Sequence, residues 1–309
     1  MKPTGKVIET LSGHGDLAVT YYRFLQSVQP VETWDDVGTL PEPIPPKAEY
    51  PIDWALIGRW AASCPPLAGV MKSVHDFDYM APRLGWNYAW TRCPQHLHLL
   101  DVIEQLYEES GRKPSLVLEP GCFTGGLLHF LAEQWQDVPC VGFDVSPVSL
   151  DVCSHYCDRL EQKNKPWWLE ADFCQIQPAN LPEGIGVRVS GGLVILSNVI
   201  ESLGKSFDRY PYLENWIPRS RLISYWVNQG ATVLLSERHA DPQLLANSIV
   251  ERAEWEKPGC TCEVMRTFDE PITSNMVPDN PLGDWQNEPG CVIRFSPPRT
   301  RALAKKKHR

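Results

Sequence analysis

From residue 115 onward, short apolar runs alternate with segments of helical periodicity, and this alternation limits the fold more than any other feature of the sequence. The apolar runs are rich in Val and Leu and are typical of strands buried on both faces; they span residues 115–119, 139–144, 191–197 and 230–237. The segments with helical spacing span residues 125–135, 146–163 and 241–256. Because strands that alternate with helices form βαβ units, the chain predicts a doubly wound, mostly parallel α/β sheet.

Three further runs complete the predicted sheet. Residues 166–172 form a weaker strand candidate between two of the strong ones. Residues 260–268 and 290–295 have strand character, and the loop between them is rich in Pro, Gly and Asn without a helical pattern. Parallel strands need a long crossover, usually a helix, so we expect a seven-stranded sheet that ends in an antiparallel pair.

The sequence divides into three parts. Residues 1–112 form an N-terminal extension, in which the proline density of residues 31–66 excludes a long helix, whereas residues 94–110 predict one. Residues 113–297 form the α/β core. Residues 298–309 form a basic tail with six Lys and Arg residues, which we expect to be disordered. A tail that binds RNA or an anionic surface is the alternative.

Charge and cysteine usage exclude several classes of protein. The 309 residues carry a net charge of −9, which argues against nucleic-acid binding over the whole surface. No apolar run approaches the length of about 18 residues that spans a membrane. The N-terminus lacks the apolar run of a signal peptide, so we expect a cytoplasmic protein whose ten cysteines are reduced. Only isolated cysteine pairs occur, at 153 with 157 and at 260 with 262, and we predict no metal site from them.

A glycine-rich turn with Gly121 and Gly125 joins the first strong strand to a helix, which is where doubly wound folds bind nucleotide-like ligands. Asp144 ends the second strand, where a carboxylate can accept both hydroxyls of a ribose. Phe123 stands where a dinucleotide site needs glycine, and no Lys-Ser/Thr pair follows the turn, so neither a dinucleotide nor a P-loop site is expected. Glu119 suits a ligand with an ammonium group, which favours S-adenosylmethionine.

Two sequence motifs carry a resemblance to a known family. EPGCFTGG at 119–126 and VGFDVSPVSL at 141–150 resemble motif I and the second-strand motif of the class I S-adenosylmethionine-dependent methyltransferases. The resemblance covers about residues 113–297 and departs from the family at Phe123, where glycine is usual. It implies a Rossmann-like, seven-stranded fold and in-line methyl transfer that yields S-adenosylhomocysteine.

The resemblance also implies where the parts of the cofactor lie. Glu119 would face the methionine part together with the turn, Asp144 would bind the ribose hydroxyls, and Val145 would flank the adenine. The other residues that the likeness assigns to the cofactor are Gly121, Cys122, Phe123 and Gly125 in the turn, Asp172 and Phe173 at the adenine amino group, and Ser197 and Asn198 beside the sulfonium. For Asp172 and Asn198, the alternative is a helix-capping role.

The sequence does not identify a general base, which an oxygen or ammonium acceptor would require. Our candidates are Glu201 and His239, which follow the fourth and fifth strands; Glu237 and His75 are further possibilities.

Two aromatic clusters suit a flat or apolar acceptor, or a cation held against ring faces. Trp86 and Tyr88 belong to the extension, and Tyr210 and Tyr212 follow the fourth strand. Docking of the extension onto the core is the alternative role. We therefore expect methyl transfer to a small or medium organic acceptor. The rival interpretations are a protein or RNA methyltransferase, a nonmethylating relative that uses the same cofactor, and a noncatalytic scaffold.

Overall fold

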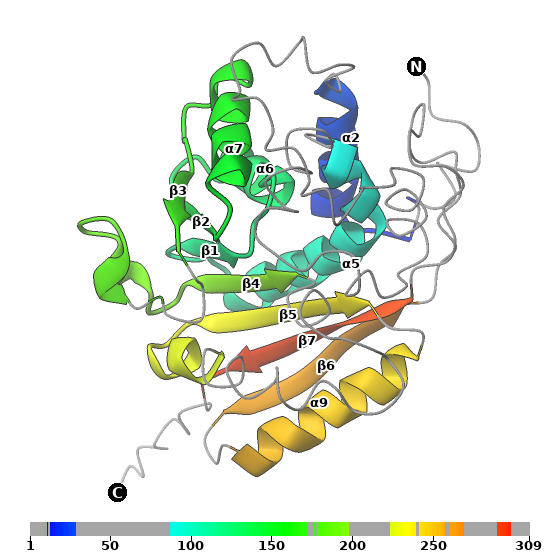
Figure 1. The fold of residues 1–309 in the computed structure, drawn as a ribbon. Helices are drawn as coiled ribbons and strands as arrows, with labels where there is room; N and C mark the ends of the chain where they lie inside the picture. Colours follow the sequence, from blue (N-terminus) through cyan, green and yellow to red (C-terminus); the bar gives the residue numbers. More distant parts are fainter. Residues whose placement is uncertain are drawn as a thin grey trace, which may run out of the picture.

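The structure, a computed structural model, describes residues 11, 13–28, 87–171, 176, 178–197, 223–238, 241–256, 260–268 and 289–297. Within this part, seven strands form one sheet in the order β3-β2-β1-β4-β5-β7-β6 (Figure 1). Their bounds are β1 Val117–Pro120, β2 Cys140–Asp144, β3 Trp167–Glu170, β4 Leu193–Ser197, β5 Thr232–Arg238, β6 Thr261–Phe268 and β7 Gly290–Ser296. The strands β1 to β5 are parallel, and β7 pairs antiparallel with both β5 and β6. The predicted fold class, including the antiparallel final pair, is confirmed.

Alternation of side chains along the central strands places one core on each face of the sheet. On β4, Leu193 and Ile195 belong to the cluster that includes α2, α5 and α6, whereas Val194 and Leu196 belong to the cluster that includes α9. The successive side chains of a strand point to opposite faces. A strand that packs against helices on both faces is therefore continuously apolar, as the sequence of β4 is.

Three helices follow the predicted pattern and begin at recognisable signals. The helices are α6 Gly126–Gln134, α7 Pro147–Arg159 and α9 Pro242–Glu256. The side chains of Ser146 and Asp241 accept hydrogen bonds from backbone N–H groups in the first turns of α7 and α9, at 3.0 and 2.9 Å. These caps satisfy donors that have no partner within the helix. The helix α7 ends four residues before the predicted end at residue 163.

The N-terminal extension contributes two helices that pack on the first core, α2 Asp16–Ser27 and α5 Asn87–Ser110. The sequence predicted that the second of these begins at residue 94, and that start is wrong, because α5 runs through Pro94. A proline inside a helix removes one backbone hydrogen bond but does not always end the helix. None of the helices in the described ranges combines the length and apolar character that crossing a bilayer requires.

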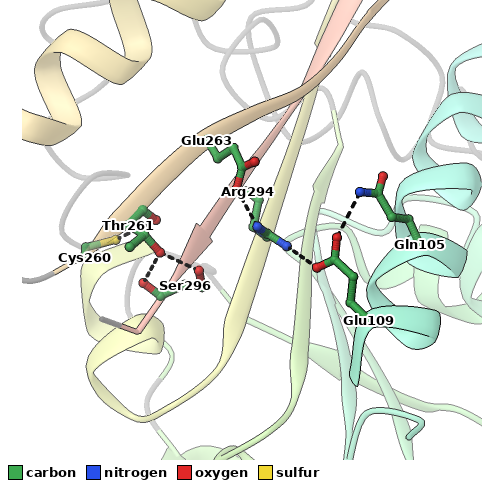
Figure 2. A network of polar contacts seen from close by, with 7 residues as sticks. All are labelled: Gln105, Glu109, Cys260, Thr261, Glu263, Arg294 and Ser296. Carbon is green, nitrogen blue, oxygen red and sulfur yellow. Dashed lines mark hydrogen bonds and ion pairs between the residues drawn. The ribbon is translucent and has the colours of Figure 1, made fainter. Parts of the chain in front are cut away.

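An ion-pair network joins α5 to the antiparallel pair. Figure 2 shows Arg294 of β7 between Glu263 of β6 and Glu109 of α5. The Arg294 side chain is only 10% exposed, and its Nη1 lies 3.1 Å from Glu109 Oε2. The network lines a cavity of about 390 Å³ between the C-terminal half of α5 and the first residues of β4 and β5. The cavity therefore lies at the amino ends of β4 and β5, at the edge of the sheet opposite the predicted site residues.

Candidate functional site

The order of the strands reverses between β1 and β4, which are adjacent in the sheet although two strands separate them in the sequence. After β1 the chain continues to β2 on one side, and after β4 it continues to β5 on the other side. Ligands of doubly wound folds bind at such a switch point, beside the carboxyl ends of the strands. Glu119 and the turn at 121–125 lie at the carboxyl end of β1, Asp144 at that of β2, and Ser197 at that of β4. The sheet thus places Glu119, the turn, Asp144 and Ser197 at one edge.

The glycine-rich turn uses left-handed backbone conformations at three positions: φ is 72° at Gly121, 47° at Phe123 and 67° at Gly125. Only Phe123 carries a side chain there, and such a conformation costs a non-glycine residue on the order of 1–3 kcal/mol. Its ring is 6% exposed and belongs to the core cluster shared with α2, α5 and α6. The sequence predicted that the bulk of Phe123 excludes a dinucleotide. The structure buries the ring in the core, and this burial offsets the backbone strain.

Asp144 holds the turn in place. Its Oδ2 accepts a hydrogen bond from the backbone N–H of Phe123 at 2.9 Å, and its Oδ1 accepts one from the backbone N–H of Ser146 at 3.0 Å. The residue is 8% exposed. The sequence predicted only a ribose contact for Asp144, whereas the structure shows that this carboxylate also fixes the turn and the start of α7. A carboxylate offers about four lone-pair sites, so these two hydrogen bonds do not by themselves exclude a ligand hydroxyl.

Glu119 is a buried carboxylate with one oxygen unsatisfied. It accepts a hydrogen bond from the backbone N–H of Leu128 in the first turn of α6. Its Oε2 has no hydrogen-bond partner within the described ranges. The pKa of this carboxyl is raised from 4.5 to about 8, chiefly by burial. The Leu128 hydrogen bond opposes the shift, and the negative charge of Asp144 adds to it. An unsatisfied buried oxygen is costly, so the site favours a ligand that donates to it.

Trp168 of β3 supports the turn from one side and was not identified from the sequence. A Cβ at Gly125 would lie 2.6 Å from its ring, and one at Gly142 would lie 2.5 Å from it. The indole N–H donates to Cys157 Sγ of α7 at 3.3 Å. Glycine at both positions is therefore required by the close approach of the indole. A tryptophan in a weakly apolar run carries no signal of this role.

The N-terminal extension places buried polar groups against the sheet. The Tyr21 hydroxyl lies 2.9 Å from Nδ1 of His96, and Gln95 donates to the Ser236 carbonyl and hydroxyl oxygens on β5, at 3.1 and 3.0 Å. Burial lowers the pKa of His96 to about 3, with the charge of Arg92 contributing, so its imidazole is neutral. Burial also raises the pKa of Tyr21, to which the charges of Cys93 and Glu119 contribute. The sequence carries no signal of these contacts, because they join α2 to α5 and α5 to β5.

The other predicted residues have different outcomes. Val145 is 38% exposed, an unusual position for an apolar side chain beside a buried strand end, and Cys122 is buried. Ser197 is half-buried at the end of β4, and Glu237 is buried at the end of β5. Tyr88 lies in α5, but its side chain is outside the description. The remaining predicted site residues lie outside the described ranges, and they are His75, Trp86, Asp172, Phe173, Asn198, Glu201, Tyr210, Tyr212 and His239.

No protein-family model matches the chain, and no curated protein is significantly similar to it in sequence. Solved structures do resemble it. Magnesium protoporphyrin IX methyltransferase from Synechocystis PCC 6803 is 15% identical, with coverage of 79% of this chain and 97% of that chain and a TM-score of 0.42. A Pyrococcus horikoshii protein, assigned only by inference as an RNA methyltransferase, is 14% identical, with coverage of 92% and 98% and a TM-score of 0.46.

The bifunctional kinase-methyltransferase WbdD is 18% identical, with a TM-score of 0.39, and the match covers 63% of this chain but only 37% of that one. These are similarities of fold, at identities too low to transfer a ligand or a reaction. The chemistry of the site has to be derived from its own residues. The observed seven-stranded, mostly parallel sheet, with its antiparallel β6–β7 pair, is the kind of sheet that the resemblance to class I methyltransferases predicts.

Proposed function

We propose that the chain binds S-adenosylmethionine at the carboxyl ends of β1, β2 and β4 and transfers its methyl group to a small or medium organic acceptor. The observation that carries the proposal is the Glu119 carboxyl group, buried beside the glycine-rich turn, whose Oε2 has no hydrogen-bond partner in the part of the chain that the structure describes. A donor that is also a cation satisfies both the hydrogen-bonding capacity and the charge of this oxygen. The amino-acid end of S-adenosylmethionine supplies such an ammonium group.

The charge of the site favours this ligand over a nucleotide with phosphates. Glu119 and Asp144 lie at neighbouring strand ends, and their mutual repulsion contributes to the raised pKa of Glu119. A phosphate placed at the turn would be repelled by Asp144 and would keep Glu119 protonated, whereas an ammonium is attracted by Asp144 and favours the ionised form of Glu119. The two hydrogen bonds that Asp144 accepts from Phe123 and Ser146 do not by themselves prevent it from accepting ribose hydroxyls as well. Val145 offers an exposed apolar surface next to it, suited to an adenine ring.

Methyl transfer asks little covalent chemistry of the protein, because the sulfonium already activates the methyl carbon. The contribution of this chain is then to orient the donor in line with the acceptor and to exclude water. Glu119 and Asp144 would fix the two ends of the donor, and the turn between them would set its depth. A general base is needed only for a protonated acceptor, and Glu201 and His239 remain our candidates for it.

The cofactor proposal is tested by calorimetric titration of the full chain with S-adenosylhomocysteine, with NAD as the control. We expect micromolar affinity for the first ligand and none for the second. Absence of S-adenosylhomocysteine binding would contradict the proposal and favour the noncatalytic scaffold. Binding of S-adenosylhomocysteine without formation of any methylated product would instead support the interpretation that the chain is a nonmethylating relative that uses the same cofactor.

The acceptor class is tested with S-adenosylmethionine that carries a radioactive methyl group. Small-molecule, RNA and protein fractions of a cell extract are incubated separately with the enzyme, and the label is followed into each. We expect label in the small-molecule fraction, because the net charge of −9 disfavours a polyanionic substrate. Label in RNA, lost with removal of residues 298–309, would favour the tail-assisted RNA alternative.

A further inference from the structure

Two histidines and an aspartate come together where the segment before α2 meets α5. His14 precedes α2, and His98 and Asp101 lie on α5. One potential ligand atom from each of the three side chains lies within 4.8 Å of the other two. The side chains of His14 and Asp101 are 2% and 11% exposed, and His98 is buried. None of the three belongs to the turn or to the strand ends of the proposed cofactor site.

Contacts around the cluster hold each side chain. Nδ1 of His14 lies 2.7 Å from Oδ2 of Asp101, and Oδ1 of Asp101 accepts the backbone N–H of Gly15 at 2.9 Å. The His98 ring stacks on Phe268 of β6 with centroids 4.3 Å apart, and the His14 ring lies 4.8 Å from His98. Groups fixed in this way lose little freedom when they bind a ligand. The cluster is therefore largely organised before any ligand arrives.

We propose that His14, His98 and Asp101 bind a divalent first-row transition metal ion, with Zn²⁺ as the representative. Imidazole nitrogen suits zinc, iron, copper and nickel, whereas magnesium and calcium prefer sites made of oxygen alone. Two His with one carboxylate is an established three-ligand set for zinc, which leaves a fourth position for water. With metal–ligand bonds of about 2.0–2.2 Å, ligand atoms in a tetrahedral site lie about 3.4 Å apart. The atoms that now lie up to 4.8 Å apart must therefore move closer, and the 2.7 Å hydrogen bond between His14 and Asp101 must open. The ion would fasten the segment before α2 to α5.

Arg266 of β6 is the competitor of such an ion. Its guanidinium pairs with the same oxygen, Oδ2 of Asp101. A guanidinium and a divalent ion repel each other, and both cannot share one carboxylate oxygen at close range. The Arg266 side chain is 33% exposed, so it has a path to solvent when an ion takes its place. The proposal therefore predicts that Arg266 weakens metal binding.

The test uses the full chain, freed of metal with a chelator and then titrated with Zn²⁺ in the presence of a competing chromophoric chelator. We expect one ion per chain. Asp101→Asn and His14→Gln should each lower the affinity at least tenfold, and Arg266→Gln should raise it. The control is His155→Gln, which removes a half-buried histidine of α7 outside the cluster and should change nothing. Co²⁺ gives a second readout, since nitrogen and oxygen ligands in a tetrahedral site produce an intense visible absorption.

Thermal unfolding distinguishes a variant that has lost the metal site from one that has failed to fold. Zn²⁺ should raise the Tm of the parent chain and of Arg266→Gln, because an ion that binds only the folded state stabilises it. It should not raise the Tm of Asp101→Asn, because that variant has lost a ligand of the ion. Absence of Zn²⁺ binding at micromolar concentration would overturn the proposal. Undiminished binding in both Asp101→Asn and His14→Gln would also overturn it, since the ion would then lie elsewhere in the chain. The outcome is independent of whether S-adenosylmethionine binds.

Discussion

The Asp144 carboxylate accepts the backbone N–H of Phe123 at 2.9 Å, so the tip of β2 restrains the turn that follows β1. Both partners are buried, and the contact spans 21 residues of sequence. It fixes a residue whose φ of 47° is strained for any side chain. One carboxylate thus links the shape of the turn to the proposed ribose contact, and a substitution there changes both.

For this reason, Asp144→Ala should affect ligand binding and folding together. We expect S-adenosylhomocysteine affinity to fall by about 1.5–3 kcal/mol, the range for hydrogen bonds to charged groups. The free energy of unfolding should fall by about 1–3 kcal/mol, because two buried backbone N–H groups lose their acceptor. Calorimetry and chemical denaturation measure the two effects. The matched control is Asp137→Ala, an exposed acid paired with Lys113, which should change neither quantity by more than about 0.5 kcal/mol. An unchanged S-adenosylhomocysteine affinity in Asp144→Ala would show that Asp144 does not bind the ribose hydroxyls.

Binding of the cofactor should release a proton from Glu119. Because its pKa is about 8, the carboxyl is mostly protonated at pH 7 in the free protein. An ammonium beside it favours the ionised form, so ligand binding should release close to one proton at pH 7 and progressively less above pH 8. The heat of S-adenosylhomocysteine binding should therefore differ between phosphate and Tris buffers. Glu119→Gln should abolish the difference. Equal heats for the parent chain in both buffers would place the ammonium elsewhere.

The raised pKa of Glu119 also predicts how the stability of the ligand-free chain depends on pH. The pKa of Glu119 in the folded chain, about 8, lies above its ordinary value of 4.5. The folded state therefore binds more protons than the unfolded state between these values, and stability falls as pH rises through this window. Denaturation at a series of pH values measures the slope, and Glu119→Gln should flatten it. A parent chain that grows steadily more stable from pH 5 to pH 8 would contradict the raised pKa.

How far the sequence predicts this molecule depends on whether a feature is local. The strands β1, β2, β4 and β5 could be predicted because residues buried on both faces form continuous apolar runs. Asp144 and Gly125 could be placed because a strand end and a turn are read from adjacent residues. The contact of Trp168 with Gly125, and that of Tyr21 with His96, join separate elements and depend on how these pack. The start of α5 was missed because a proline is a strong local signal that packing overrides.

Gly125→Ala should cost more than its backbone conformation alone explains. A Cβ there would lie 2.6 Å from the Trp168 ring, and φ is 67°. Gly111 offers a matched control, because its φ is 66° and no atom lies within 4 Å of an added Cβ. Gly111→Ala should cost about 1–2 kcal/mol of stability, the penalty of the left-handed conformation. Gly125→Ala should cost about 1–3 kcal/mol more through overpacking, and it alone should weaken S-adenosylhomocysteine binding. Equal losses of stability in the two variants would show that the Trp168 ring can move away from the added Cβ without a cost in free energy.

Arg294→Gln should lower stability without affecting the cofactor. The Arg294 side chain is 10% exposed, but those of its partners Glu109 and Glu263 are 46% and 56% exposed, so water can solvate these carboxylates when the arginine is removed. We therefore expect a loss of about 1–2 kcal/mol in the free energy of unfolding, below the 3–5 kcal/mol typical of a fully buried broken pair. The loss should shrink at high salt, because the carboxylates are partly screened. A double-mutant cycle with Glu109→Gln isolates the contact between α5 and β7. S-adenosylhomocysteine affinity should match that of the parent, since Arg294 borders the cavity at the amino ends of β4 and β5. A clear loss of affinity would mean that this edge of the sheet is coupled to the cofactor site.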